Sequence, residues 1–267
     1  MKKLIYFAVL FFLMCSCTKE IELDYNDIEP IPVIEGHLTP DTAEVIITKT
    51  RNMNDSVKTE GIKVDDVRII LPDGEEFQMD FQSDGYYRLD SKKINLVTGN
   101  TYKLKVTIDG VEYTGESTLQ PKIEISEPEF LWTYFMDWMQ VLEFETTNVP
   151  DNLQVYCWAR IYRNGKIYFS DAGSCKGNFP FDIGLYYDSD MENDPEMILN
   201  DGDNLKLEFR SIDEDVYNYL AEYNQTKTNP KQYFTTSVEG KICLGFFAVY
   251  DYVVFETTYV KTPQEQR

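Results

Sequence analysis

The sequence has a single histidine, His37, and its 46 acidic residues far outnumber its 25 lysine and arginine residues. A Cys–His metal site needs several closely spaced ligands, so one histidine and the widely spaced cysteines after Cys17 predict no such site. A catalytic triad built on His37 would need a nucleophile motif that the sequence does not supply. The formal net charge of −21 argues against a nucleic-acid partner, since such proteins place lysine and arginine against phosphates.

Enzyme motifs are also missing. The sequence has no Gly-x-Ser-x-Gly, no Walker-type glycine loop and no paired-carboxylate pattern that spacing alone can identify. A glycosidase would need two carboxyl groups about 5 Å or about 6.5–9.5 Å apart, and no motif names them. We therefore predict a protein without a cofactor and without enzyme activity. A hydrolase with a site hidden in the second domain is an alternative that we rank below the two functions given at the end of this section.

Long apolar runs are absent except for one near the N-terminus, over residues 4–14. Two lysines precede this run, and Ser16 stands just before Cys17. The run is too short to remain as a membrane span, and a small residue before a cysteine is typical of a lipoprotein signal. We predict a signal peptide over residues 1–16 and an acyl group on Cys17 that holds the protein at the membrane. An ordinary signal peptide or a short membrane anchor is the alternative.

Residues 17–29 are polar and acid-rich and show no packing pattern, so we predict an acidic tether. Acidic residues directly after an acylated cysteine resemble the signal with which Bacteroidota export lipoproteins to the outer face of the outer membrane. This resemblance implies a lipid-anchored outer-membrane protein that faces outside the cell. The alternative is a solvated leader without a sorting message.

Three cysteines follow Cys17, namely Cys157, Cys175 and Cys243, in what would be an oxidising compartment. An odd number of cysteines cannot all pair within one chain. We predict a disulfide between Cys157 and Cys175, because the turn at Gly165 can fold their two segments together. Cys243 lies in an apolar strand, where it is either a buried thiol or the true partner.

Short strands alternate with turn signals between residues 30 and 120. Strands are predicted at 33–38, 43–48, 66–71, 75–81, 85–89, 98–106 and 111–113. Pro72-Asp73-Gly74 is a typical turn, since proline presets φ and glycine accepts a positive φ. This pattern predicts one small β-sandwich. Gly85-Tyr86-Tyr87 and the Thr-Gly-Asn-Thr-Tyr segment at 98–102 resemble the carboxypeptidase-regulatory type of immunoglobulin-like module.

Residues 121–267 predict a second domain. Strands are expected at 140–146, 153–162, 166–169 and 205–209, with a hairpin turn at Asn164-Gly165. Ser211 and Glu214 form a capping-box pattern ahead of an apolar stripe at helical spacing. The predicted fold class is therefore mainly β, with an N-terminal immunoglobulin-like β-sandwich over 30–120 and a second β-rich domain over 121–267 that carries one or more short helices.

The segment 130–139 is unusually aromatic and contains Trp132, Tyr134 and Trp138. Trp and Tyr dominate interface hot spots, so these three residues are our candidate surface for a ligand or partner. A buried core is the alternative, since aromatic side chains also fill protein cores.

Between residues 171 and 202 the strand pattern gives way to Gly, Pro, Asn and acidic residues, which predicts a long loop that is functional or mobile. Acidic residues at alternate positions of 188–194 superficially resemble a calcium loop. The positions that an EF-hand reserves for glycine and glutamate hold Asn193 and Leu199, so we interpret the segment as a solvated acidic loop.

Several segments along the chain form a recognisable series. They are Gly36-His37-Leu38-Thr39, Val216-Tyr217-Asn218-Tyr219-Leu220, Thr228-Asn229-Pro230, Ser237-Val238-Glu239-Gly240 and Leu244-Gly245-Phe246-Phe247-Ala248. Together with Thr-Lys-Glu directly after Cys17, they resemble a Bacteroidota lipoprotein family known as domain of unknown function 4249. Gly245 beside two aromatic residues also suggests a strand that another backbone or a ring approaches closely.

The family that the chain resembles is implied to lie beside TonB-dependent receptors. Our leading functional prediction is therefore a non-enzymatic surface lipoprotein that captures a ligand for, or assists, a TonB-dependent transporter. The sandwich would act as a spacer and docking surface. The main alternative is a structural or adhesive surface module that contacts other proteins or polysaccharide.

Overall fold

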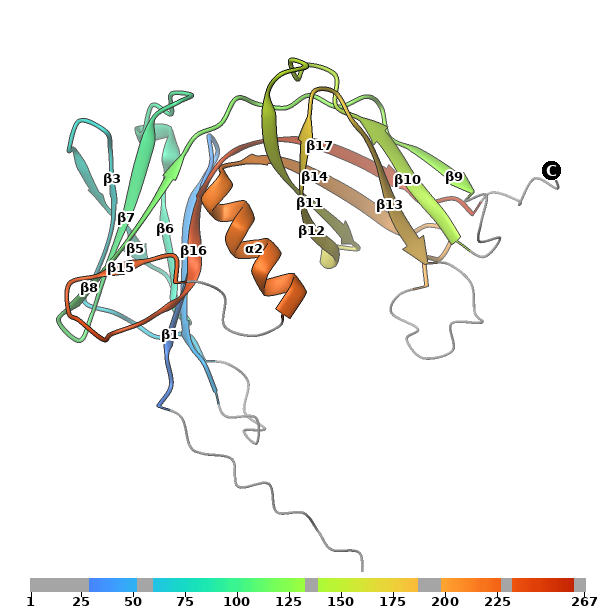
Figure 1. Cartoon of the computed structure of the whole chain (residues 1–267). Helices are drawn as coiled ribbons and strands as arrows, with labels where there is room; N and C mark the ends of the chain where they lie inside the picture. The colour runs from blue at the N-terminus through green and yellow to red at the C-terminus, as the bar shows by residue number, and fades with distance from the viewer. Residues whose placement is uncertain (1–28, 52–59, 133–138, 187–197, 227–231, 262–267) are drawn as a thin grey trace, which may run out of the picture.

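A computed structural model of the chain describes residues 29–51, 60–132, 139–186, 198–226 and 232–261. These residues form two β-sheet halves with one helix, α2, packed between them (Figure 1). The prediction of a mainly β fold with a short helix is confirmed. Within the described residues, no helix is both long and apolar enough to cross a membrane. The predicted signal peptide, the acyl site Cys17 and the acidic segment 188–194 lie outside these residues.

The first half is a sandwich of two five-stranded sheets, in the orders β16-β1-β2-β6-β5 and β15-β8-β7-β3-β4. Its elements are β1 (Pro32–Leu38), β2 (Ala43–Lys49), β3 (Asp66–Ile70), β4 (Glu76–Gln78), β5 (Asp80–Phe81), β6 (Tyr86–Leu89), η1 (Ser91–Lys93), β7 (Thr101–Ile108), β8 (Val111–Thr118), β15 (Thr235–Thr236) and β16 (Leu244–Val249). Buried positions alternate with less buried ones along β3 and β7, as expected when one face of a sheet covers a core. The predicted strand 75–81 divides at Met79 into β4 and β5, which belong to opposite sheets.

The C-terminal part of the chain returns to complete this sandwich. β16 runs parallel to β1, with Val33 opposite Leu244, and β15 pairs with β8 (Figure 1). The sandwich therefore extends beyond the predicted range of 30–120. Gly245 has a φ of +100°, and a Cβ at this position would lie 1.9 Å from the Ile34 carbonyl oxygen. Glycine thus lets the two backbones meet, and the close approach predicted at Gly245 is confirmed.

The second half packs a four-stranded sheet, β12-β11-β14-β17, against a three-stranded sheet, β13-β10-β9. Its strands are β9 (Glu129–Trp132), β10 (Met139–Glu145), β11 (Gln154–Arg163), β12 (Lys166–Lys176), β13 (Pro180–Tyr186), β14 (Asn204–Ile212) and β17 (Asp251–Thr258). The prediction of a loop from residue 171 is wrong, because β12 continues to Lys176 and β13 follows. Pairing with β11 and β10 supplies the backbone hydrogen bonds, so these polar, Gly-containing segments form strands.

Helix α2 (Glu214–Thr226) begins directly after β14. Asp213 is its N-cap, since its Oδ1 accepts a hydrogen bond from the Val216 amide at 2.9 Å. The capping box predicted at Ser211 is wrong because β14 continues through Ile212. Ser211 is part of that strand, and its hydroxyl donates to the Pro121 carbonyl at 2.6 Å.

Asp213 also ties the start of α2 to the first half. Its Oδ2 accepts hydrogen bonds from the Ser117 hydroxyl at 2.5 Å and from the Thr118 amide at 2.8 Å, both in β8. At the middle of the helix, the Tyr219 hydroxyl accepts a hydrogen bond from the Gly245 amide of β16 at 2.7 Å. These bonds fix α2 against the sandwich, where it forms one wall of the space between the halves.

Candidate functional site

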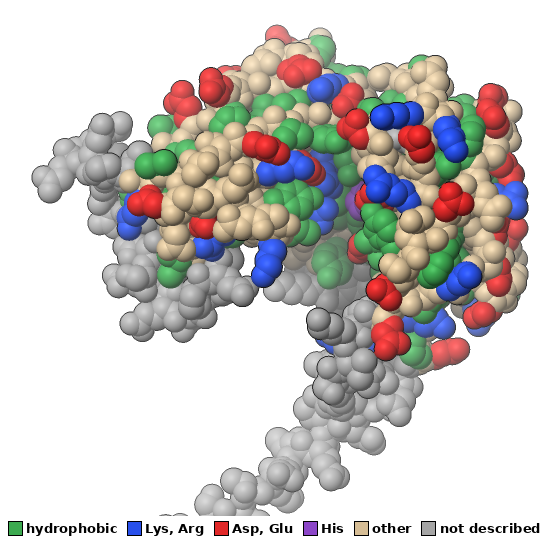
Figure 2. Space-filling model, turned by 180° about the vertical axis from the view of Figure 1, so that it is seen from behind, with side chains coloured by type: hydrophobic (Ala, Val, Ile, Leu, Met, Phe, Trp, Pro, Cys, Tyr) green, Lys and Arg blue, Asp and Glu red, His purple; other side chains and the backbone are tan. Residues whose placement is uncertain are grey.

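A cavity of about 470 Å³ lies between the two halves of the molecule. We call it the cleft. β1 and β16 of the first half, β11 and β12 of the second half, and α2 form its walls. Its lining residues are Val33, Glu35, His37, Thr50, Trp158, Arg160, Ser170, Tyr219, Leu220, Tyr223, Asn224, Leu244 and Phe246. Figure 2 shows this hollow from behind, with basic and apolar side chains and the histidine in its walls. Its volume falls in the range of small-molecule sites.

Side chains of β11 point alternately to its two faces, and one of these faces forms the polar wall of the cleft. Cys157, Ala159 and Ile161 point into the core between the two sheets of the second half. Successive side chains of a strand point to opposite faces, so Trp158 and Arg160 face the cleft. β1 behaves in the same way, since its buried residues fill the sandwich core while Glu35 and His37 face the cleft.

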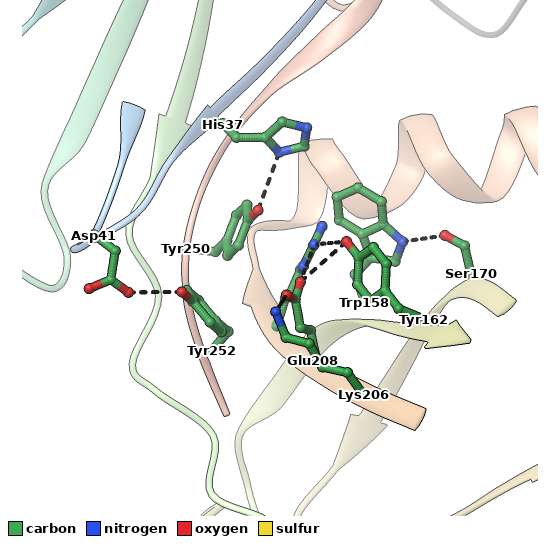
Figure 3. Close-up of polar contacts among 10 residues, drawn as sticks. His37, Asp41, Trp158, Tyr162, Ser170, Lys206, Glu208, Tyr250 and Tyr252 are labelled. Atoms are coloured by element: carbon green, nitrogen blue, oxygen red, sulfur yellow. Dashed lines mark hydrogen bonds and ion pairs between the residues drawn. The ribbon is translucent and has the colours of Figure 1, made fainter. Parts of the chain in front are cut away.

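Trp158 organises this wall. Its indole is only 4% exposed, and its Nε1 donates a hydrogen bond to the Ser170 hydroxyl at 2.9 Å (Figure 3). The guanidinium carbons of Arg160 and Arg210 lie 4.6 and 4.5 Å from its ring centroid. The His37 ring stacks on the indole at 5.9 Å. Because neighbouring groups already cover the indole, Trp158 is a support for other side chains and does not offer a free ring face to a ligand.

Arg210 is a buried cation beside this indole, 4% exposed. Its Nη2 donates hydrogen bonds to the Tyr162 hydroxyl at 3.1 Å and to Glu208 Oε2 at 2.5 Å. Lys206 Nζ lies 2.6 Å from the other oxygen of Glu208 (Figure 3). Burial by itself would raise the pKa of Glu208, but its bonds to Arg210 and Lys206 outweigh burial and lower the pKa. Glu208 is therefore an anion that is neutralised by protein groups.

His37 is a neutral imidazole in this setting. Burial, assisted by the positive charges of Arg210 and Arg160, lowers its pKa to about 3. Its Nδ1 lies 3.3 Å from the Tyr250 hydroxyl (Figure 3). At neutral pH the ring adds no charge to the cleft and can only exchange hydrogen bonds.

Arg160 is the cation that lines the cleft. Within the described part of the chain, no residue forms a hydrogen bond or ion pair with its guanidinium, and its Nε is buried without a hydrogen-bond partner. Glu35 also lines the cleft; burial raises its pKa, while the Arg160 charge opposes that rise. Such an arginine can accept a ligand group without first breaking a protein contact.

Chemistry by paired carboxylates or by a metal finds little support in the described residues. Glu35 is the one carboxylate among the side chains that line the cleft, and Glu208 nearby is held by Arg210 and Lys206. No group of three His, Cys, Asp or Glu side chains within the described ranges is arranged to hold a metal ion. The arrangement is suited to binding.

The structure does not bring the predicted aromatic surface to the cleft. Trp132 is half-buried at the end of β9, in the sheet that covers the opposite face of the second half. Tyr134 and Trp138 lie outside the described residues. Trp132 therefore belongs to a different layer of the molecule from Trp158.

The three cysteines after Cys17 are free and buried in the structure. Gly173 is opposite Cys157 in the ladder, and Cys175 is two residues further along the same face of β12. The predicted segments are thus neighbours, but the Cys157–Cys175 bond is not formed here. Burial raises the pKa of Cys157 and of Cys243 to about 12, so neither is a reactive thiolate at neutral pH.

Sequence reasoning missed Arg160, Arg210 and Trp158 as site residues. One signal was available: from Tyr156 to Tyr162 every second residue is aromatic or basic, whereas the residues between are small or apolar. This alternation predicts a strand with a polar, aromatic outer face. The positions of His37 and Arg210 beside that face depend on strand pairings far apart in the sequence.

Comparison with known proteins gives a family for the chain. A family model described as a domain of unknown function, DUF4249, matches residues 18–254. No curated protein matches the chain. The family match includes both halves of the fold and every residue that lines the cleft. The chain belongs to the DUF4249 family.

Proposed function

We propose that the protein is a lipid-anchored protein of the outer membrane that captures a ligand in the cleft and works beside a TonB-dependent transporter. The observation that carries the capture step is Arg160, which faces a cavity of ligand size and has no hydrogen-bond or ion-pair partner among the described residues. The membrane part of the proposal rests on the apolar run before Cys17 and on the acidic segment that follows it.

The division of the fold agrees with such a role. The first half has a hydrophobic core of its own, between its two sheets. The cleft lies where the two halves and α2 meet. A small, largely aromatic cluster that includes Trp158, Tyr219 and Phe246 joins the halves, and these three residues also line the cleft. A site of this kind can hold a ligand without chemical change and release it to a partner.

The test is recovery of a partner from native membranes. A tagged chain expressed in a Bacteroidota host is extracted in mild detergent and purified through the tag. We expect a TonB-dependent barrel to be recovered with it. The matched control is Cys17→Ala, which removes the acylation site. This variant should no longer be found in the membrane fraction, and no barrel should be recovered with it. Recovery of no outer-membrane barrel by the acylated chain would contradict the transporter partnership.

A further inference from the structure

We infer that the cleft selects an organic anion, with an oxyanion of the ligand bound by Arg160 and its apolar body held against Leu220, Leu244 and Phe246. This inference rests on the proposed capture function and names the class of ligand. Carboxylates, sulfonates and phosphates share the chemistry that a guanidinium recognises.

The first argument is local charge. The chain has a formal net charge of −21, yet three cations lie together at this wall. They are Arg160, Lys206 and Arg210. Glu208 neutralises one of these charges and Glu35, in the cleft lining, offsets at most a second, so at least one positive charge remains. The cleft is therefore a positive site on an acidic protein, and it attracts an anion out of solution.

The second argument is the state of Arg160. Its guanidinium carbon lies 4.6 Å from the Trp158 ring centroid and 6.0 Å from that of Tyr162. Such ring contacts hold a guanidinium in place without using its N–H groups, which stay available as donors. The Nε–H of Arg160 is buried without a hydrogen-bond partner, which costs free energy, so a ligand oxygen that accepts from this group gains affinity.

The other side chains of the lining indicate what the rest of the ligand should be like. Val33, Leu220, Leu244 and Phe246 supply apolar surface, while Asn224 and Ser170 supply polar groups at the margin. A cationic ligand would be repelled by the unpaired arginine. A ligand that is apolar with one anionic end satisfies both parts of the cleft.

Two fluorescent probes that differ in one group test this inference. Anilinonaphthalene sulfonate and phenylnaphthylamine share the same ring system, and only the first carries a sulfonate. The whole chain is used with Cys17→Ser, so that no acyl group competes for the probes. We expect one tight site for the sulfonate probe and much weaker binding of the neutral probe.

Substitutions in the cleft test whether the probes bind there and whether Arg160 binds the sulfonate. Arg160→Gln should weaken binding of the sulfonate probe about 10- to 100-fold, the cost of one charge-assisted hydrogen bond, and leave the neutral probe unchanged. Lys103→Gln removes one positive charge from an exposed side chain of β7, remote from the cleft, and should change neither affinity. Leu220→Trp fills the cleft and should weaken both probes. If Arg160→Gln does not fold, Arg160→Lys keeps the charge and should keep the preference for the sulfonate.

Equal affinity for the two probes would overturn the inference. So would equal effects of Arg160→Gln and Lys103→Gln, or binding that Leu220→Trp leaves intact. Each of these results concerns ligand class alone, because recovery of a TonB-dependent barrel by the acylated chain is measured separately. Recovery of the barrel together with failure of the probe test would leave the transporter partnership standing without the anion.

Discussion

The Nδ1 atom of His37 lies 3.3 Å from the hydroxyl oxygen of Tyr250, and 213 residues separate them in the chain. His37 belongs to β1, whereas Tyr250 stands between β16 and β17, where the chain passes from the first half to the second. Of these two residues, His37 lines the cleft, and Tyr250 stands behind it. The imidazole lies beside Arg160 and Arg210, where a third positive charge is unfavourable.

His37 should make stability depend on pH. Its pKa falls from 6.5 to about 3 on folding, because of burial and the nearby Arg210 and Arg160. Between these values the unfolded chain binds a proton that the folded chain does not, so stability decreases as the pH falls, by at most about 1.4 kcal/mol per pH unit. Denaturant melts from pH 7 to pH 4 should show that the advantage of wild type over His37→Gln shrinks on acidification.

Glu35→Gln provides the control of opposite sign. Burial raises the pKa of Glu35, so the folded chain holds its proton more tightly and stability decreases as the pH rises above 4.5. The substitution should therefore raise stability relative to wild type at neutral pH. A difference between wild type and His37→Gln that stays constant from pH 7 to pH 4 would contradict the assignment of a neutral, buried imidazole.

Removal of Arg210 should destabilise the fold, because Glu208 would lose one of the two cations that neutralise its buried charge. Arg210→Met is expected to lower the free energy of unfolding by about 3–5 kcal/mol, as for a broken buried ion pair. The double variant Glu208→Gln/Arg210→Met should recover much of this loss. Lys103→Met breaks an exposed pair with Glu116 and should cost less than about 1 kcal/mol. Equal effects of the two single substitutions in urea melts would show that Arg210 is not buried with its partner.

Gly245 should tolerate no side chain. Its φ is +100°, and an added Cβ would lie 1.9 Å from the Ile34 carbonyl oxygen, so Gly245→Ala forces β16 away from β1. We expect a loss above about 3 kcal/mol. Gly240 has a φ of +79° but open space around it, so Gly240→Ala should cost only about 1–2 kcal/mol. Thermal melts of the pair separate the clash from the backbone strain, and similar losses would refute the tight β1–β16 contact.

Asp213 should control the start of α2. Asp213→Ala removes the cap of the Val216 amide and two further hydrogen bonds, with an expected loss of about 2–4 kcal/mol. Hydrogen exchange at the Val216 amide should accelerate. Ser211→Ala loses only the bond to the Pro121 carbonyl and should leave that amide protected. Faster exchange in Ser211→Ala would instead support Ser211 as the cap.

Local sequence signals predicted the strands and turns well. Asn164 and Gly165 have φ values of 50° and 81°, as the predicted two-residue hairpin turn requires. The same local reasoning misplaced the cap at Ser211, because a Ser-x-x-Glu pattern has the same appearance when a strand continues through its first residue. Beyond residue 171, glycine and polar residues indicated a loop, although pairing with β11 and β10 makes strands of them.

The cleft was beyond the reach of local reasoning. Arg160 looked like an ordinary strand residue, and Trp132 looked more prominent than Trp158 because its neighbours in sequence are aromatic. Their different roles follow from which sheet each occupies and from which face of that sheet meets β1 and α2. Those relationships join parts of the chain that no short window of sequence contains.

The parallel pairing of β1 with β16 has a consequence for how the protein is made. During synthesis β1 emerges early, and the neighbour that covers its edge arrives only near the end of the chain. Until then an unpaired strand edge is open to wrong partners, including other copies of the chain. Completion of the sandwich and assembly of the cleft are therefore the same late event, and a chain that stops before residue 244 would have neither.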